Sequence, residues 1–399
     1  MVIGGGAAGV AAARTLHDAG RPVLLVEASD RLGGRARSLA LPELGATVDL
    51  GCGWLHSAAR NPWTAIAERS GFTVDRSPAP WERQWRDLGF PPAERAAYGA
   101  AWERWERAAM AARDGPDRPL SDFIAPDDPW RPLIDAVSGY VNGAPLARVS
   151  LHDWAAYEDG ATEDDWTVRE GYGALVASHA AGVPVRLGTA VTRVDRGGHT
   201  LRLDTAAGTI EADRVVVAVP TPVLADGGLR FDPPLPDKRA AAADLPLGLA
   251  DKVFLAVDGP EWPANEHLIG DPHGACTASH RLSPHGRPVI ESFFGGDCAE
   301  ALEDRDAAAF AIEELVRLLG GGWRRRLRPV AVTRWRREPC IRGSYSHARV
   351  GCAGQRAVLA RPVQERIFFA GEACSTGDFS TAHGAYATGV AAARAIISS

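Results

Sequence analysis

The chain has 399 residues, of which 46% are hydrophobic and 24% are charged, and its formal net charge is −6. A chain of this length can bury a large core without the help of disulfide bonds. The near balance of 44 basic and 50 acidic residues argues against a nucleic-acid partner and against attraction to an anionic membrane surface, because both require concentrated positive charge.

The six cysteines are scattered, with no Cys-x-x-Cys pair and no histidine cluster beside them. This spacing excludes the common zinc and thioredoxin-like motifs. We therefore predict no metal site and interpret the cysteines as buried thiols in a reducing cytoplasm. We expect no signal peptide before the first motif, and no apolar run approaches the roughly 18 residues that cross a bilayer. We expect a cytoplasmic protein without membrane contact; the oligomeric state is left open.

The N-terminal residues have the pattern of a dinucleotide-binding unit. Gly4-x-Gly6-x-x-Gly9 lies between a short strand and an alanine-rich helix over residues 10–19. Glycines at this spacing allow a tight turn and let the backbone approach a pyrophosphate, whose charge is stabilised at the helix N-terminus. The apolar strand that follows ends in Glu27, the acid expected to bind the ribose hydroxyls.

A second glycine-rich loop follows this acid. Gly33 and Gly34 again permit close approach of the backbone to a phosphate, and Arg35 supplies a guanidinium fork. A second glycine–arginine loop at this place favours FAD over NAD, which has no need of it. The two loops together predict an FAD site.

The rest of the chain alternates helical and extended patterns. Residues 76–150, rich in Trp, Arg, Glu and Ala, predict a mainly helical insertion with one helix over 93–113. A further helix is predicted over 307–319, and the C-terminus predicts a strand, a loop and an alanine-rich helix. Strands are predicted at 184–187, 200–204, 214–219, 245–258, 288–294 and 330–334.

This order predicts an α/β protein in which a Rossmann-type FAD-binding domain is interleaved with an α+β substrate domain on a mixed sheet. The predicted FAD-binding domain comprises residues 1–75, 166–240 and 346–399. The predicted substrate-binding domain comprises residues 76–165 and 241–345.

Four further segments carry a family resemblance. They are residues 49–56 (DLGCGWLH), 247–255 (LGLADKVFL), 343–346 (GSYS) and 369–373 (FAGEA). With the glycine motifs, they resemble the flavin-containing amine oxidase family, nearest its polyamine-oxidase branch. The resemblance covers nearly the whole chain and is weakest across the helical insertion. It implies FAD as cofactor, and a small amine and O2 as reactants.

Lys252 begins an apolar predicted strand. A buried lysine is costly unless it is paired, and a lysine at the sheet edge facing solvent is the ordinary alternative. The resemblance implies the buried position, where this lysine bonds through a water to flavin N5 and assists hydride departure or the attack of oxygen.

The resemblance assigns three more residues to the substrate side. Tyr345 forms one wall of an aromatic cage around the amine, with a half-buried core tyrosine as the alternative. Thr381 stands where monoamine oxidases place the second cage tyrosine, which puts a two-tyrosine cage in doubt. His56 lies near the substrate amine, or is a hydrogen-bonded core histidine. Ser344 replaces the cysteine that links FAD covalently in mammalian-type monoamine oxidases, so the FAD is expected to be non-covalent.

On the cofactor side, Glu372 is expected to bond the ribityl or pyrophosphate region. The helix that starts near Thr381 is expected to direct its N-terminus at flavin O2, where negative charge develops. The predicted cofactor-binding residues are Gly4, Gly6, Ala8, Gly9, Glu27, Ala28, Gly33, Gly34, Arg35, Gly53, Trp54, Val191, Pro220, Trp335, Gly371, Glu372, Thr381 and Ala382.

The sequence therefore predicts oxidation of an amine to an imine, which is hydrolysed to an aldehyde or ketone, with O2 reduced to peroxide. Two alternatives remain: a flavin-dependent desaturase or protoporphyrinogen-type oxidase, and a catalytically idle flavin-binding protein. Lys252 and residues 343–346 weigh against the desaturase. His383 is interpreted as a packing histidine, and the acidic stretch 158–165 as a solvated loop.

Overall fold

A computed structural model describes all 399 residues. The molecule has two halves, and the first is built on a five-stranded parallel sheet with the order β19-β12-β1-β2-β8. The strands come from three distant parts of the chain, which all lie in the segments predicted for the FAD-binding domain. They are β19 (Ile367–Phe369), β12 (Val215–Val217), β1 (Val2–Ile3), β2 (Leu25–Val26) and β8 (Val185–Arg186).

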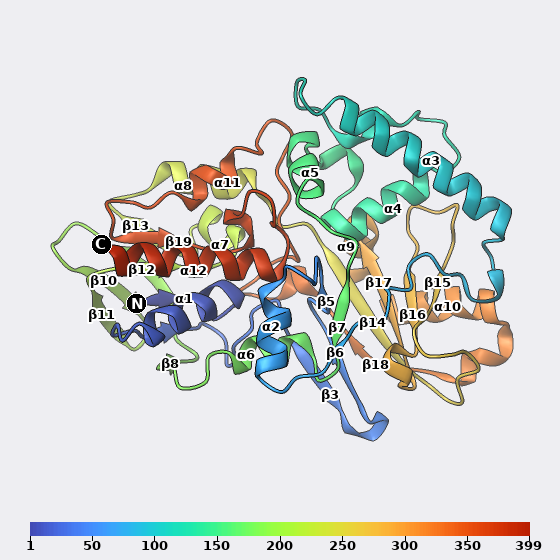
Figure 1. The fold of residues 1–399 in the computed structure, drawn as a ribbon, viewed down its shortest axis with the longest axis horizontal. Helices are drawn as coiled ribbons and strands as arrows, with labels where there is room; N and C mark the ends of the chain where they lie inside the picture. The colour runs from blue at the N-terminus through green and yellow to red at the C-terminus, as the bar shows by residue number, and fades with distance from the viewer.

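Two helices lie side by side on this sheet, α1 (Ala7–Asp18) and the C-terminal α12 (Ala382–Ser398) (Figure 1). They can approach closely because Gly389 has no side chain. A Cβ at this position would lie only 2.1 Å from the Ala8 carbonyl oxygen. The Rossmann-type arrangement predicted from the glycine motif is therefore present.

The first helix begins at Ala7 and not at residue 10, so Gly9 belongs to its first turn. A Cβ there would lie 1.8 Å from the Gly4 carbonyl oxygen. Gly9 therefore lets the helix pack on the strand, and it does not line the cavity described below. Its role in cofactor binding stays a prediction.

The second half is built on a five-stranded antiparallel sheet with the order β15-β16-β17-β14-β18. One face packs on α9 (Gly296–Glu303) and α10 (Ala307–Leu319), the latter as predicted. The other face is turned toward a cavity. The strands are β15 (Glu266–Ile269), β16 (Ser279–Leu282), β17 (Val289–Gly295), β14 (Ala250–Val257) and β18 (Leu327–Val332).

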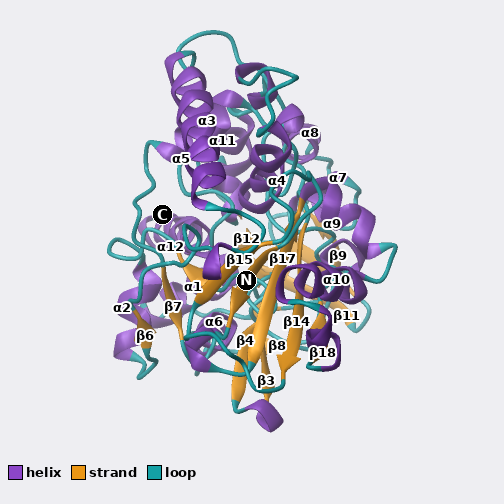
Figure 2. Cartoon of the chain, turned by 90° about the vertical axis from the view of Figure 1, so that its right-hand side faces the viewer, coloured by secondary structure: helices purple, strands orange, loops and turns teal.

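The predicted helical insertion is present and covers this second half. It extends past the predicted end at residue 150 and contains α3 (Pro92–Ala111), α4 (Arg131–Asn142) and α5 (Leu151–Glu158), which Figure 2 shows gathered above the strands. Trp105 is buried and Trp102 is half-buried, and both side chains line the cavity. The insertion therefore serves both as packing and as cavity wall.

Smaller elements join the two halves. None of the helices combines the length and the apolar character that crossing a bilayer requires. The remaining strands are β3 (Ser38–Leu41), β4 (Ala46–Asp49), β5 (Trp54–Leu55), β6 (Val74–Asp75), β7 (Trp166–Val168), β9 (Val191–Asp195), β10 (Leu201–Thr205), β11 (Gly208–Ala212) and β13 (Arg230–Asp232); the remaining α-helices are α2 (Pro62–Arg69), α6 (Tyr172–Ser178), α7 (Thr221–Ala225), α8 (Pro236–Asp244) and α11 (Gln355–Ala360).

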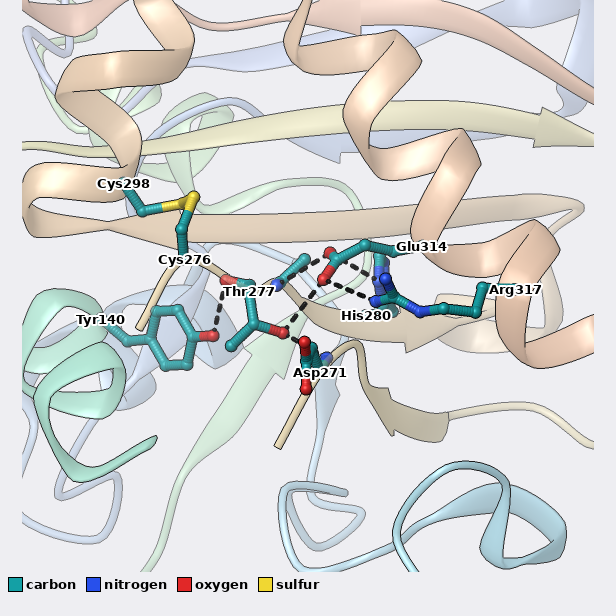
Figure 3. The surroundings of a disulfide bond; sticks show 9 residues. Tyr140, Asp271, Cys276, Thr277, His280, Cys298, Glu314 and Arg317 are labelled. Atoms are coloured by element: carbon teal, nitrogen blue, oxygen red, sulfur yellow. Dashed lines mark hydrogen bonds and ion pairs between the residues drawn. A yellow bond between two sulfur atoms is a disulfide. The ribbon is translucent and has the colours of Figure 1, made fainter. Parts of the chain in front are cut away.

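Two cysteines depart from the prediction of free thiols. Cys276, in the loop before β16, and Cys298, in α9, form a disulfide (Figure 3). They are 22 residues apart in the sequence, and the fold of the sheet brings them together. No spacing pattern in the sequence predicts this pairing. The interpretation of all six cysteines as thiols was therefore wrong. Disulfides are rare in reducing compartments, and the cytoplasmic location stays a prediction. The free cysteines are Cys52, Cys340, Cys352 and Cys374.

A buried ion pair joins the insertion to the C-terminal part of the chain. Arg356 in α11 donates from Nε and Nη2 to the Asp153 carboxylate of α5, over 2.6 and 2.8 Å. The two side chains are 1% and 2% exposed. Removing one charge from a buried pair strands the other in a medium that cannot solvate it.

We therefore expect Asp153→Asn to lower the free energy of unfolding by about 3–5 kcal/mol, measured by urea denaturation. The matched control is Arg324→Gln, which breaks an exposed pair with Glu313 and should leave the midpoint unchanged. Equal midpoints for the wild type and Asp153→Asn would show that this pair does not hold the two parts together.

Candidate active site

One continuous cavity of about 1540 Å³ extends between the two halves of the molecule. Pockets for a single small ligand usually measure about 300–1,000 Å³, so this cavity has room for a dinucleotide and a substrate together. All the predicted site residues except Gly9 line it. The fold thus brings together side chains from the first loop of the chain and from its last helix.

The two predicted glycine-rich loops form one wall. The Gly33 N–H donates to the Gly5 carbonyl over 2.8 Å, and Gly6 pairs with Gly33 in an isolated bridge. Gly4 has φ +102°, and a Cβ there would lie 2.4 Å from the Ala218 carbonyl oxygen, so only glycine fits. A Cβ on Gly6 would meet nothing closer than the Gly33 oxygen at 3.9 Å, since it faces the cavity.

The N-terminus of α1 opens onto this wall. Gly6 is its N-cap residue and gives no side-chain cap, and the first N–H groups of a helix have no acceptor within the helix. Ala7 and Ala8 line the cavity at this point. An uncapped helix N-terminus beside a bare glycine backbone is the arrangement that binds phosphate groups, so the residues present fit the pyrophosphate of a dinucleotide.

Glu27 stands next to this wall, at the end of β2. Its Oε2 accepts from the Gly5 N–H over 2.5 Å, and its Oε1 accepts from the Ser29 N–H and hydroxyl over 2.8 Å. A carboxylate offers about four lone-pair sites, so acceptor capacity is left for a ligand. Ala28 and Val191 line the cavity beside it, which fits the predicted adenosine end.

Glu372 is held by a dense set of donors. Its carboxylate accepts from Arg35 Nη1 over 2.8 Å, from the Ser346 hydroxyl over 2.6 Å and from the Ser380 N–H over 2.9 Å. Burial alone would raise the pKa of Glu372, but the charges of Arg35 and Arg356 and the Ser346 hydrogen bond hold that pKa below its ordinary value. Glu372 is therefore an anion in the wall of the cavity.

The same geometry changes the expectation for Arg35. Its Nη1 donates to the Glu372 carboxylate and, over 2.7 Å, to the Ser344 carbonyl. Arg35 was expected to give its guanidinium to a phosphate. In the structure it compensates the charge of Glu372 and also lines the cavity.

A second helix N-terminus reaches the cavity at Thr381, the N-cap residue of α12. Its hydroxyl accepts from the Gly384 N–H over 3.0 Å and donates to the Asp378 carbonyl over 2.6 Å. Thr381 and Ala382 line the cavity, so the positive end of the helix dipole lies at its wall, as the resemblance implies. His383 is buried and bonded to Asp378 over 3.2 Å, so its interpretation as a packing histidine is confirmed.

Lys252 projects from β14 into the cavity and is not on the outer surface. Its ammonium donates to the Asp49 carbonyl over 3.0 Å and pairs with the Glu291 carboxylate over 2.7 Å. A Cβ on Gly53 would lie 3.5 Å from its Nζ. Lys252 thus meets the segment that the resemblance assigns beneath the flavin, and the solvent-facing alternative is excluded.

Tyr345 lies in the cavity wall with its hydroxyl donating to the Tyr140 carbonyl. Burial raises the pKa of Tyr345 well above the ordinary tyrosine value, so its hydroxyl stays protonated. The Tyr140 ring is 5.8 Å from the ring of Phe293, which also lines the cavity. The Phe293 ring lies 5.8 Å from the Lys252 ammonium, so an aromatic wall begins beside this lysine; Thr381 supplies no second tyrosine.

Figure 3 shows how the disulfide loop supports this wall: the Tyr140 hydroxyl donates to the Thr277 carbonyl over 2.9 Å, beside Cys276. The loop is tied in turn to α10, because Glu314 accepts from the Thr277 hydroxyl over 3.1 Å. The disulfide is thus linked through Tyr140 to the carbonyl that receives the Tyr345 hydroxyl.

His56 lines the cavity with its Nδ1 2.6 Å from the Asp165 carboxylate and its ring stacked 6.3 Å from that of Trp81. Glu158 lines the cavity as well, and burial, followed by the charge of Glu106, raises its pKa to about 7. The stretch 158–165 was expected to be a solvated loop. That interpretation was wrong for Glu158, the last residue of α5, and for Asp165, because both line the cavity.

Sequence reasoning missed two charged residues of the cavity, Glu291 on β17 and Arg281 on β16. For Glu291 a signal was available, because it is the one charged residue in the largely apolar stretch 289–294. For Arg281 there was none, because β15 and β16 are too polar to be recognised as strands. The remaining predicted contacts, Gly53, Trp54, Pro220, Trp335 and Gly371, all line the cavity.

Comparison with known proteins agrees with this geometry. Residues 7–397 match the model of the family described as flavin containing amine oxidoreductase. The chain belongs to this family. Polyamine oxidase 2 of Arabidopsis thaliana is 30% identical, with 98% of this chain and 86% of the relative covered. Polyamine oxidase 4 of Oryza sativa subsp. japonica is also 30% identical, over 98% of this chain and 87% of the relative.

The same fold occurs in putrescine oxidase solved with bound putrescine, which is 21% identical with a TM-score of 0.78, covering 100% of this chain and 98% of that one. The predicted family, fold class and FAD-dependent amine oxidation are therefore confirmed. The desaturase and the idle flavin-binding protein are not favoured. The roles of individual site residues stay predictions.

The phosphate wall gives a direct test of FAD binding. Gly6 has φ −75° and ψ −176°, which alanine adopts freely, and a Cβ there has room within the protein. We expect Gly6→Ala to fold normally and to raise the Kd for FAD at least about 10-fold, or ~1.4 kcal/mol, because its methyl group occupies the space of the pyrophosphate. Titration of the apoprotein with FAD, followed by fluorescence, measures this.

Gly321→Ala is the matched control, because a Cβ at that exposed position meets nothing within 4 Å. It should bind FAD like the wild type. If Gly6→Ala bound FAD equally well, the pyrophosphate would not lie at the N-terminus of α1.

Proposed function

We propose that this protein is an oxidase that converts a small primary or secondary amine to an imine, with O2 as the electron acceptor and peroxide as the by-product. FAD, when bound, supplies the redox chemistry: it accepts the hydride from the carbon next to nitrogen and returns the electrons to O2. The names of the relatives refer to polyamines and that of the structural neighbour to putrescine.

The observation that carries the proposal is the placement of Lys252. A lysine buried at 8% side-chain exposure is held against Gly53 by the Asp49 carbonyl and the Glu291 carboxylate. Its charge is compensated, so it is stable in the cavity wall and still presents a proton donor there. We assign it to the oxygen half of the reaction, where a fixed positive charge stabilises developing negative charge.

The amine half is assigned to the aromatic wall and to His56. Tyr345 presents a ring fixed through its hydroxyl bond to Tyr140, and aromatic faces favour amines held over them. His56 is oriented by Asp165 and can accept or return a proton as the amine enters and the product leaves. Thr381 caps α12 and holds the helix N-terminus at the cavity.

The FAD is proposed to be held without a covalent bond. Ser344, at the position where the resemblance implies a linking cysteine in other members, is buried. Its hydroxyl donates to the Ala250 carbonyl over 2.7 Å and accepts from the Ala250 N–H over 2.8 Å. Both bonds are internal to the protein, and a hydroxyl has no thiolate chemistry to offer.

Replacing Lys252 tests the proposal. We expect Lys252→Met to retain FAD and anaerobic reduction by amine, but to slow reoxidation by O2 by about 10²-fold or more, the usual worth of one positioned acid or charge. Stopped-flow absorbance separates the two half-reactions. Because the substitution leaves Glu291 unpaired, the double variant Lys252→Met, Glu291→Gln serves as the compensated form and should behave alike.

Lys238, the other lysine of the chain, provides the matched control. It is buried against the carbonyls of Val358 and Leu359, away from the cavity. Lys238→Met should lower stability without altering the rate of reoxidation. Unchanged reoxidation in Lys252→Met would remove that lysine from the mechanism.

A second test uses pH. The amine must be neutral when its hydride leaves, so we expect kcat/KM to rise from neutral to alkaline pH. Glu158 ionises as pH passes its pKa of about 7, which adds a negative charge to the cavity and favours entry of the ammonium form. Glu158→Gln should therefore remove an inflection near that pH and keep the alkaline rise; a flat or falling profile would contradict the requirement for a neutral amine.

A further inference from the structure

Three charged side chains form a row on the cavity face of the antiparallel sheet. Lys252 on β14, Glu291 on β17 and Arg281 on β16 come from three adjacent strands, and all of them line the cavity. In the strand register Arg281 lies directly opposite Glu291, and Glu291 lies opposite Phe254. Phe254 is two residues beyond Lys252 on β14 and is therefore on the same face of the sheet. The row runs from the proposed reaction site toward the edge of the sheet.

The charges in this row are unequally compensated. Lys252 and Glu291 pair over 2.7 Å and neutralise each other. Arg281 has no carboxylate within ion-pair distance; its only hydrogen bond is from Nη2 to the Asn265 side chain, over 2.7 Å. The Nε of Arg281 is buried without any partner. Glu291 acts on it only from a distance, since its closest bond is to the lysine.

A guanidinium in this position needs an anion. Arg281 is half-buried, its Nε atom is fully buried, and burial lowers its pKa from the ordinary value, although an arginine remains charged in proteins. Its guanidinium lies 4.6 Å over the ring of Trp54, which fixes its plane but does not neutralise it. A buried cation left unpaired is costly, so the missing counter-charge points to a ligand.

The position of Trp54 sets where that ligand lies. Trp54 follows Gly53, where an added Cβ would lie 3.5 Å from the Lys252 ammonium, and the Arg281 guanidinium lies over the Trp54 ring. A substrate whose amine reaches the wall of Lys252 and Tyr345 therefore extends past Trp54 toward Arg281. Both ends of one small molecule can be held in this compartment.

We propose that Arg281 binds a carboxylate of the substrate, so that the amine oxidised by this protein is an amino acid or a related amine carrying a carboxylate. The inference rests on the proposed function. A planar carboxylate matches the donor fork of a guanidinium and supplies the charge that Arg281 lacks. A second ammonium at the same place would be repelled, so diamines are the poorer substrates.

Two matched series of probes test the inference. The first is 4-aminobutyrate, butylamine and 1,4-diaminobutane; the second is leucine and 3-methylbutylamine. In the holoenzyme we expect the rate constant for anaerobic flavin reduction, relative to Kd, to be about 10- to 100-fold higher for the carboxylate in at least one series, the usual worth of a hydrogen bond between charged groups. Arg281→Gln should abolish the preference without loss of FAD.

Arg95→Gln is the matched control, because Arg95 also lines the cavity but already pairs with Asp87 over 2.6 Å. It should leave the preference unchanged. A wild-type protein that favours the diamine, or an Arg281→Gln variant that keeps a preference for carboxylates, would overturn the inference.

Binding without turnover separates this inference from the proposed function. Calorimetric titration with butyrate should give a Kd that rises about 10- to 100-fold in Arg281→Gln, while the midpoint of thermal unfolding stays near that of the wild type. If no amine reduced the flavin but butyrate binding still required Arg281, the oxidase proposal would fail and the carboxylate site would stand. Butyrate binding that is absent, or equal in the two proteins, would remove the site whatever the turnover.

Discussion

A buried carboxylate holds the cavity together. Glu372 follows the last strand of the parallel sheet and receives Arg35 from the N-terminal part of the chain, together with the Ser346 hydroxyl. Arg356 bonds the same serine and the buried Asp153 of the helical insertion. Three distant parts of the chain therefore meet around one negative charge. Because a buried charge must be paired, these contacts fix the relative position of the walls that they join.

The antiparallel sheet positions the reacting side of the cavity by strand alternation. Successive side chains of a strand point to opposite faces, so Val253 enters the core against α10 while its neighbour Lys252 enters the cavity. The same alternation on β17 and β16 places Glu291 and Arg281 on the cavity face of the sheet. One sheet thus supplies both the hydrophobic core of the second half and a polar wall, and the rigidity of that core holds the charges in register.

The charges that line the cavity are paired to different degrees in its different parts. At the wall formed by the glycine-rich loops the N-terminus of α1 and a bare glycine backbone face the cavity, and the carboxylates of Glu27 and Glu372 are already hydrogen-bonded. Beside the proposed reaction site Lys252 and Glu291 cancel. Arg281 forms no ion pair on the sheet wall, and we propose that this lets the sheet distinguish between the two ends of a substrate.

The sequence by itself determined the parts that depend on neighbouring residues: the glycine loops with Glu27, the helix over 307–319, the insertion, and the family motif around Lys252. Such signals are local, because backbone conformation and periodicity are set within a few residues. The disulfide, the engagement of Arg35 by Glu372 and the row formed by Glu291 and Arg281 were decided only by the tertiary structure. They join residues from different strands and helices, and no local pattern encodes which of these become neighbours.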